Sequence, residues 1–246
     1  PQTDPNGGAG AAPQIVGGLI IGAGAQNADA AADGDDENFL TNTNPINDTD
    51  FQFTLTAVGE DVTINYILID LAQDNNPIDA STDLDLNSCR LYLDTGTTAG
   101  EVDGADTNLA ATVTDDNSSR LRFALPLPTT ITNGTTITLV VRLALDGDAD
   151  AGQDIQLTID VDPTTETVPV DAVGGTTGAQ IKADYDDTLN PANEVTGSLL
   201  TLIQGTLDIT VGGNNGTLTA GGELTNATVD SAGFQATLTA TNETVG

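Results

Sequence analysis

Two acidic segments hold the residues whose types and spacing could do chemistry. Residues 94–106 gather four carboxylates, and residues 146–154 hold a second cluster, largely at alternate positions. Clustered carboxylate and carbonyl oxygens are the ligands that Ca²⁺ prefers. Both segments are therefore candidate calcium sites, with ligands Asp94, Glu101, Asp103 and Asp106 in the first and Asp146, Asp148, Asp150 and Asp154 in the second.

The spacing within each segment leaves a second interpretation open. In the first segment, Gly96 and Thr98 stand where a helix-loop-helix calcium site has acidic or amide ligands. In the second, alternating acids converge on one cation if the chain forms a loop, but share a solvated face if it forms a strand. The alternative to calcium is an acidic surface that only water covers.

Catalytic chemistry finds few candidates. The chain has no histidine, one cysteine (Cys89) and one lysine (Lys182), so histidine-based triads and histidine-ligated metals are excluded. No glycine-rich phosphate loop occurs. Two carboxylates can hydrolyse a glycoside, but 37 acids single out no pair. We therefore expect a protein that is not an enzyme, with Cys89 as a buried small hydrophobic residue.

The net charge of −32 bears on the partners. A field of this sign repels nucleic acid and anionic membrane surfaces, and no apolar run is long enough to span a membrane. We expect neither nucleic acid binding nor direct membrane insertion. Six Asn-X-Ser/Thr sequons are compatible with secretion and glycosylation, at Asn47, Asn117, Asn133, Asn215, Asn226 and Asn242.

An internal repeat organises the elements around these segments. Phe51-Gln-Phe-Thr-Leu-Thr-Ala57 returns as Phe234-Gln-Ala-Thr-Leu-Thr-Ala240, and Glu60 and Val62 return as Glu243 and Val245, at a constant offset of 183 residues. The tail is therefore a copy of the front. Two arrangements give this pattern: a window from a longer tandem array, or a subunit whose terminal strand occupies a neighbour. The repeated strand presents Phe234, Ala236, Leu238 and Ala240 on one face.

The N-terminal region predicts a second candidate for strand exchange. Residues 1–48 are rich in Gly, Ala, Asn and Asp and are expected to be a flexible leader, interrupted by the apolar run at 15–21, which has no obvious hairpin partner. This run is the candidate donor strand, through Ile15, Val16, Leu19, Ile20 and Ile21. An ordinary edge strand of the same domain is the alternative.

Residues 49–197 predict a β-sandwich core, followed by C-terminal strands in 198–246. Alternating apolar residues predict strands at 51–57, 62–69, 89–93, 109–113, 121–125, 137–145, 155–161, 199–203, 207–211 and 234–240. Pro126 and Pro128 are expected to end the fifth strand, the sixth and seventh to form a hairpin, and residues 162–196 to be loop-like. We predict an all-β protein, an antiparallel β-sandwich of jelly-roll or Ig-like type with about ten strands and an extended N-terminal strand segment.

Three segments carry a resemblance to a known class of module. They are Phe51-Gln-Phe-Thr-Leu-Thr-Ala-Val-Gly-Glu-Asp-Val-Thr63, Cys89-Arg-Leu-Tyr-Leu-Asp-Thr95 and Thr136-Ile-Thr-Leu-Val-Val-Arg-Leu143. This set resembles a module found in tandem in large bacterial and archaeal cell-surface proteins, over roughly residues 50–161. In that module a calcium-type loop follows the Leu-Tyr-Leu-Asp strand, and residues 95–106 depart from its pattern. The chain is also similar to secreted β-sandwich subunits that form pilus-like biofilm fibres by strand donation.

The resemblance implies an extracellular structural role in a surface layer (S-layer), adhesin stalk or filament. Together with the repeat it predicts a cell-surface protein that polymerises head to tail with copies of itself through β-strand complementation. The alternative is a calcium-stiffened adhesin or S-layer module of a longer protein.

Overall fold

A computed structural model describes most of the chain. The described residues are 17–27, 40–41, 44–47, 49, 51–71, 76–117, 119–160, 169–181, 183–185, 194–202, 206–211 and 236–241. They divide into two units, within residues 1–202 and 203–246. The sequence boundary at 197 falls close to this division, but the strand at 200–202 belongs to the first unit.

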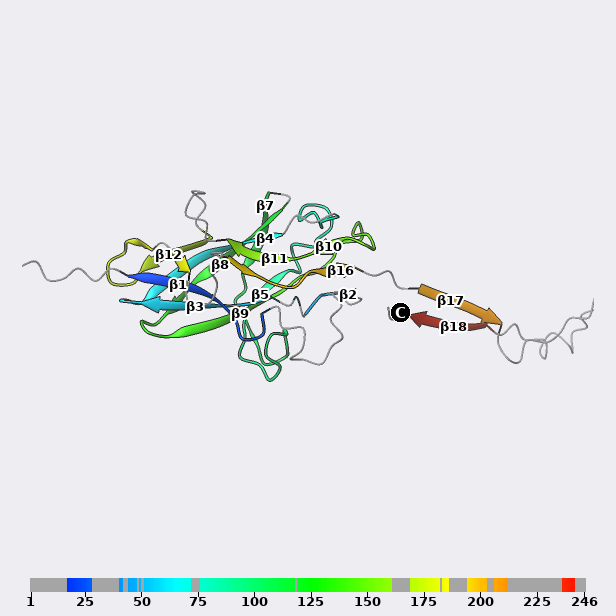
Figure 1. The fold of residues 1–246 in the computed structure, drawn as a ribbon, viewed down its shortest axis with the longest axis horizontal. Helices are drawn as coiled ribbons and strands as arrows, with labels where there is room; N and C mark the ends of the chain where they lie inside the picture. Colours follow the sequence, from blue (N-terminus) through cyan, green and yellow to red (C-terminus); the bar gives the residue numbers. More distant parts are fainter. Residues whose placement is uncertain are drawn as a thin grey trace, which may run out of the picture. The chain divides into compact units, whose positions relative to one another are not determined.

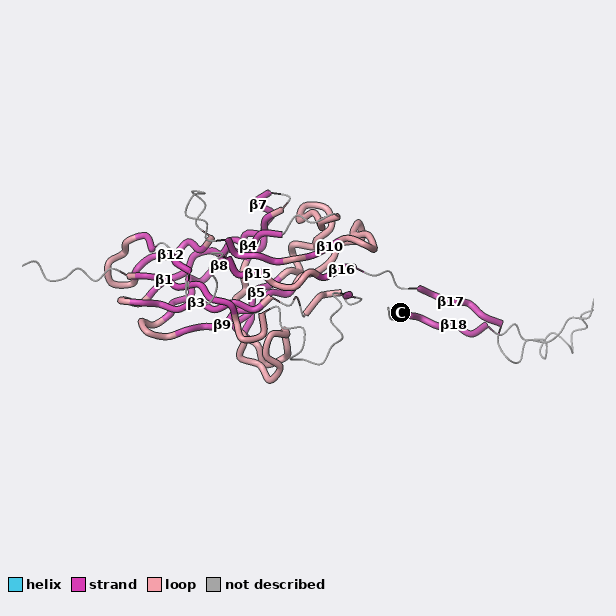
Figure 2. The backbone as a smooth tube through the Cα atoms, in the orientation of Figure 1, coloured by secondary structure: helices cyan, strands magenta, loops and turns pink. Residues whose placement is uncertain are grey.

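The described residues form strands and loops and no helix, so the protein is all-β (Figure 2). The strands of the first unit, in Figure 1, are β1 (Gly18–Ala23), β2 (Leu40–Thr41), β3 (Gln52–Val58), β4 (Val62–Leu71), β5 (Arg90–Leu93), β6 (Thr107–Asn108), β7 (Thr112–Asn117), β8 (Arg120–Ile131), β9 (Thr136–Arg142), β10 (Asp154–Ile155), β11 (Leu157–Asp160), β12 (Val170–Gly174), β13 (Gln180–Ile181), β14 (Ala183–Tyr185), β15 (Glu194–Thr196) and β16 (Leu200–Leu202). The second unit contains β17 (Thr206–Val211) and β18 (Ala236–Thr241).

The first unit contains three sheets, and most of its strand pairs are antiparallel. A six-stranded sheet has the order β14-β1-β3-β9-β5-β6. A seven-stranded sheet runs β13-β12-β4-β11-β15, with β8 beside β4 and β7 beside β8. A small sheet has the order β10-β16-β2. The parallel pairs are β1 with β14 and β16 with β2.

One hydrophobic core serves the strands of the first unit. In β3, Phe53, Leu55 and Ala57 are fully buried, as the period-two pattern predicts. Phe123 of β8, in the seven-stranded sheet, is buried in the same cluster. Burial of a Phe or Leu side chain stabilises a fold by about 1.5–3 kcal/mol, so this core is the main stabilising element of the unit.

The predicted hairpin of residues 137–145 and 155–161 is wrong. β9 lies in the six-stranded sheet between β3 and β5, whereas β11 lies in the seven-stranded sheet beside β4 and β15. Alternation in a sequence determines which face of a strand is buried but not which strand is its neighbour. Two strands that contribute to one core from different sheets therefore have the same sequence pattern as a hairpin.

The prediction that Pro126 and Pro128 end a strand is also wrong, because β8 continues to Ile131. Both prolines are exposed, and they lie where the β4–β8 register shifts between Ile64 and Tyr66. Among the described residues, β7 pairs with β8 only as far as Ala124. Proline is tolerated at bulges and at unpaired strand edges because no ladder hydrogen bond is needed there.

Two other regions differ from expectation. Residues 162–196, expected to be loop-like, contain β12, β13, β14 and β15, which have five residues or fewer and so show little alternation. Residues 1–48 are not only a leader, since β1 lies within a sheet and Ile46 is buried against the core. The run at 15–21 does have partners: β1 pairs antiparallel with β3 and parallel with β14.

Candidate functional site

The first acidic segment, residues 94–106, folds its carboxylates onto its own backbone. Asp103 accepts hydrogen bonds from the backbone N–H groups of Thr97 (2.7 Å), Thr98 (3.1 Å) and Ala105 (2.7 Å). These bonds, that from Ala105 foremost, lower the pKa of Asp103 to about 2. The carboxylate is thus a structural acceptor that stabilises the loop.

Neighbouring acids in this segment are oriented in the same way. Asp106 accepts hydrogen bonds from the backbone N–H groups of Thr95 (2.8 Å) and Gly96 (2.6 Å) through one oxygen and from that of Asp103 (2.9 Å) through the other. Asp94 accepts from the N–H of Gly100 and from the Gln52 side chain. The spacing of acids in this segment therefore reflects backbone capping in addition to any affinity for cations.

The second acidic segment, residues 146–154, exposes most of its carboxylates. Asp146, Asp148 and Asp150 are exposed on the loop before β10. Asp154 accepts a hydrogen bond from the Thr201 hydroxyl (2.7 Å). Within the described part of the chain no hydrogen bond reaches the carboxylates of Asp148 and Asp150, and no group of three or more Asp, Glu, Cys or His side chains lies close enough to hold a metal ion. Calcium binding stays a prediction.

A third carboxylate, Glu60, is almost completely buried, with 3% of its surface exposed. Its Oε2 atom accepts hydrogen bonds from the backbone N–H groups of Thr176 (2.8 Å) and Thr177 (2.9 Å), and its Oε1 atom accepts from the Thr177 hydroxyl (2.7 Å). The N–H of Gly17 also donates to it. These bonds, led by that from the Thr177 hydroxyl, lower the pKa of Glu60.

We call this arrangement the Glu60 latch, formed by Glu60, Gly17, Thr176 and Thr177. It ties together the residue before β1, the turn after β3 and the turn between β12 and β13. A Cβ atom at Gly17 or Gly174 would collide with the Glu60 carboxylate, so the latch requires glycine at both positions. Our sequence analysis missed it, although the recurrence of Glu60 as Glu243 was a signal.

The candidate donor strand is in place within its own chain. Leu19 and Ile21 have no exposed surface, and Ile20 is half-buried. Ile15 and Val16 lie outside the described residues. The repeated strand corresponds to β18, which pairs with β17; Ala236, Leu238 and Ala240 lie in it, and Phe234 lies outside the described residues.

The remaining candidate positions divide in a similar way. Asn47, Asn117 and Asn133 are exposed, whereas Asn215, Asn226 and Asn242 lie outside the described residues. Cys89 is buried, and desolvation raises the pKa of its thiol to about 11, which makes it unreactive. A cavity of about 310 Å³ lies beside β5 and β7 and is lined by Leu86, Asn87, Arg90, Asn108, Ala110, Ala111, Thr112 and Val113. No helix among the described residues is able to cross a membrane.

Comparisons with known proteins give little guidance. No protein-family model matches the chain, and no curated protein is similar to it. Among solved structures, the chain is similar to AvmM, which catalyses macrocyclisation in alchivemycin A biosynthesis. The identity is 12%, the match covers 78% of this chain and 90% of AvmM, and the TM-score is 0.28. A similarity at this level supports no conclusion about activity.

Proposed function

We propose that the protein is an extracellular structural component of a surface filament or layer, built from β-sandwich modules arranged head to tail. The observation that carries the proposal is that β18 has the sequence of β3 and is again a strand. The first unit is one module, a β-sandwich in which the six-stranded and seven-stranded sheets share a core. The second unit begins another.

The character of the surface supports this role. A net charge of −32 keeps the modules soluble and repels anionic partners. The carboxylates of residues 94–106 accept hydrogen bonds from their own loop, and three sequon asparagines are exposed, where glycans could be attached. These features suit a structural protein in contact with the extracellular medium.

Two routes of assembly fit the proposal. Tandem modules on one polypeptide are favoured by β1, which fills its place in its own sheet with Leu19 and Ile21 fully buried. Strand complementation is the second route: an equivalent strand from a neighbour would replace β1 between β3 and β14. Main-chain pairing on two edges and two buried apolar side chains would hold the exchanged strand.

The first experiment is the intact mass of the denatured native polypeptide, compared with negative-stain micrographs of the material that cells export. A mass several times 25.0 kDa together with fibres or layers is the expected result for tandem modules. A mass near 25.0 kDa together with fibres would indicate exchange of β1 instead. A native protein that stays inside the cell and forms no assembly would overturn the proposed function.

A variant without residues 1–27 separates the two routes. If β1 belongs only to its own module, this variant loses its cooperative melting transition, because the six-stranded sheet loses a strand with two fully buried side chains. If β1 is exchanged, a peptide of residues 15–27 added in trans restores the transition. A matched peptide with Leu19→Asp and Ile21→Asp is the control and restores nothing.

A further inference from the structure

The β17–β18 hairpin reproduces the β1–β3 pair residue by residue. In the first unit, Leu19 stands opposite Ala57 and Ile21 opposite Leu55. In the second unit, Leu207 stands opposite Ala240 and Ile209 opposite Leu238. The two cross-strand pairs are thus identical in residue type and in register, and both pairs of strands are antiparallel.

The correspondence of β17 with β1 is not visible at the repeat offset. β18 follows β3 at 183 residues, whereas β17 follows β1 at 188 residues, because the connection within the hairpin is five residues shorter. The strand pairing therefore reveals a match that an ungapped alignment misses. A one-residue change of register would place the apolar residues on the other face, so agreement at both pairs is a specific signal.

The flanking sequence agrees with the strand pairing. Gly205 directly precedes β17 as Gly17 directly precedes β1, and Glu243 follows β18 by two positions as Glu60 follows β3. In the first unit Gly17 and Glu60 meet in the latch. The second unit thus has the same residue types at the two positions that the latch requires from this part of a module.

We infer that β17 and β18 are the first two core strands of a second module, and that the free edge of β18 accepts a strand equivalent to β9 from that module. In the first unit, β9 occupies this edge of β3, with Leu55 opposite Ile137 and Thr54 opposite Thr138. β18 has Leu238 and Thr237 at the same register positions. Among the described residues β18 pairs with β17 alone.

The occupant is a second copy of the module and not β9 of the first. β9 already pairs with β3 on one edge and with β5 on the other, so no edge of it is left for β18. A two-stranded hairpin by itself is at best marginally stable in water. The β17–β18 amides are therefore expected to exchange quickly until a strand of the β9 type covers the β18 edge.

The inference rests on the head-to-tail modules of the proposed function, and an extended chain tests it directly. Residues 1–245 are followed by a second copy of residues 63–202, since Val245 stands in the repeat where Val62 stands. The expected result is a calorimetric unfolding enthalpy about twice that of the 246-residue chain, because unfolding enthalpy scales with the residues folded. Amides of β18 should gain about 100-fold or more in exchange protection.

A reference chain and one pair of variants make the test decisive. The reference is residues 1–202 followed by residues 17–202, which repeats the first unit with its own β1 and β3. If the reference shows the doubled enthalpy and the extended chain does not, the inference is wrong. In the extended chain, Leu238→Asn should abolish the gain, whereas Thr239→Asn, one position along the strand, should leave most of it.

This outcome is separate from that of the proposed function. The enthalpy and the exchange rates are measured on purified protein, whereas the proposed function is judged on exported material. A protein that never reaches the cell surface could still complete a second module. Conversely, surface fibres could form although β17 and β18 take no part in a module.

Discussion

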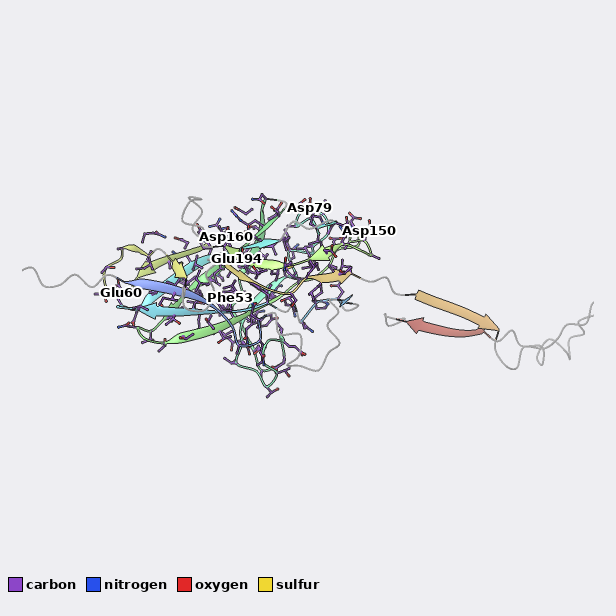
Figure 3. The ribbon with its side chains drawn as sticks, in the orientation of Figure 1. Phe53, Glu60, Asp79, Asp150, Asp160 and Glu194 are labelled. Carbon is purple, nitrogen blue, oxygen red and sulfur yellow. The ribbon has the colours of Figure 1, made fainter. Side chains whose placement is uncertain are left out.

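Carboxylates at the two ends of the first unit behave differently. Figure 3 shows Glu60 near the end where β1 begins and Asp150 near the opposite end. Glu60 is buried and accepts hydrogen bonds from the backbone of a distant turn, whereas Asp148 and Asp150 are exposed on the loop before β10. An acid-rich composition therefore contains two populations: one holds the fold together, and the other is available to solvent and cations.

Replacement of Glu60 should have the largest effect on this contrast. Glu60→Ala leaves the N–H groups of Thr176 and Thr177 without their acceptor in a site that water scarcely reaches. We expect the melting temperature to fall by about 5–10 °C, and by less for Glu60→Gln, which keeps an acceptor oxygen. Scanning calorimetry measures the shift. Asp148→Ala is the matched control, and an equal shift in both variants would remove the distinction between the two populations.

Asp103 should give a smaller effect, because its loop is partly open to water. Asp103→Ala removes the acceptor for the N–H groups of Thr97, Thr98 and Ala105. We expect a fall of a few degrees in melting temperature and at least about 10-fold faster hydrogen exchange at these amides. Exchange rates measured by NMR check the result. Unchanged rates would show that other contacts hold the loop.

Acid should weaken the structural carboxylates first. The pKa of Asp103 falls from 3.8 to about 2 in the folded protein, and that of Glu60 lies below 4.5. A lowered folded-state pKa contributes stability that is complete above the unfolded value and is lost as the pH falls through the folded value. The melting temperature should therefore decline from about pH 4.5 towards pH 2, less steeply in the double variant Glu60→Gln with Asp103→Asn. Parallel pH profiles would contradict this assignment.

The sequence was most informative where a strand is long and half-buried. Alternation predicted β3, β4, β5 and β9, because each places apolar residues of period two against a core. It failed where tertiary neighbours decide the outcome. β8 continues through Pro126 because the edge beside it is unpaired, and β12 to β15 are too short to show a period.

The candidate sites show the same limit. Spacing identified residues 94–106 as rich in oxygen ligands, but the direction of each carboxylate depends on turns that bring N–H groups to it. Glu60 had one sequence signal, its recurrence as Glu243, and that signal says nothing about Thr176 and Thr177, which lie more than a hundred residues further along the chain. Contacts over such separations follow from the topology of the sheets and not from local pattern.

The exposed loop should give the smallest change in stability and the sharpest response to calcium. A triple variant with Asp146→Asn, Asp148→Asn and Asp150→Asn should melt within about 2 °C of the wild type without calcium, because exposed side chains contribute little. If these acids bind Ca²⁺, added calcium raises the melting temperature of the wild type and not of the triple variant, since a ligand stabilises only the state that binds it. The comparison is made at constant ionic strength, because salt alone screens a net charge of −32. An equal response in both proteins would assign the loop to the solvated surface, so that the exposed carboxylates would serve solubility alone.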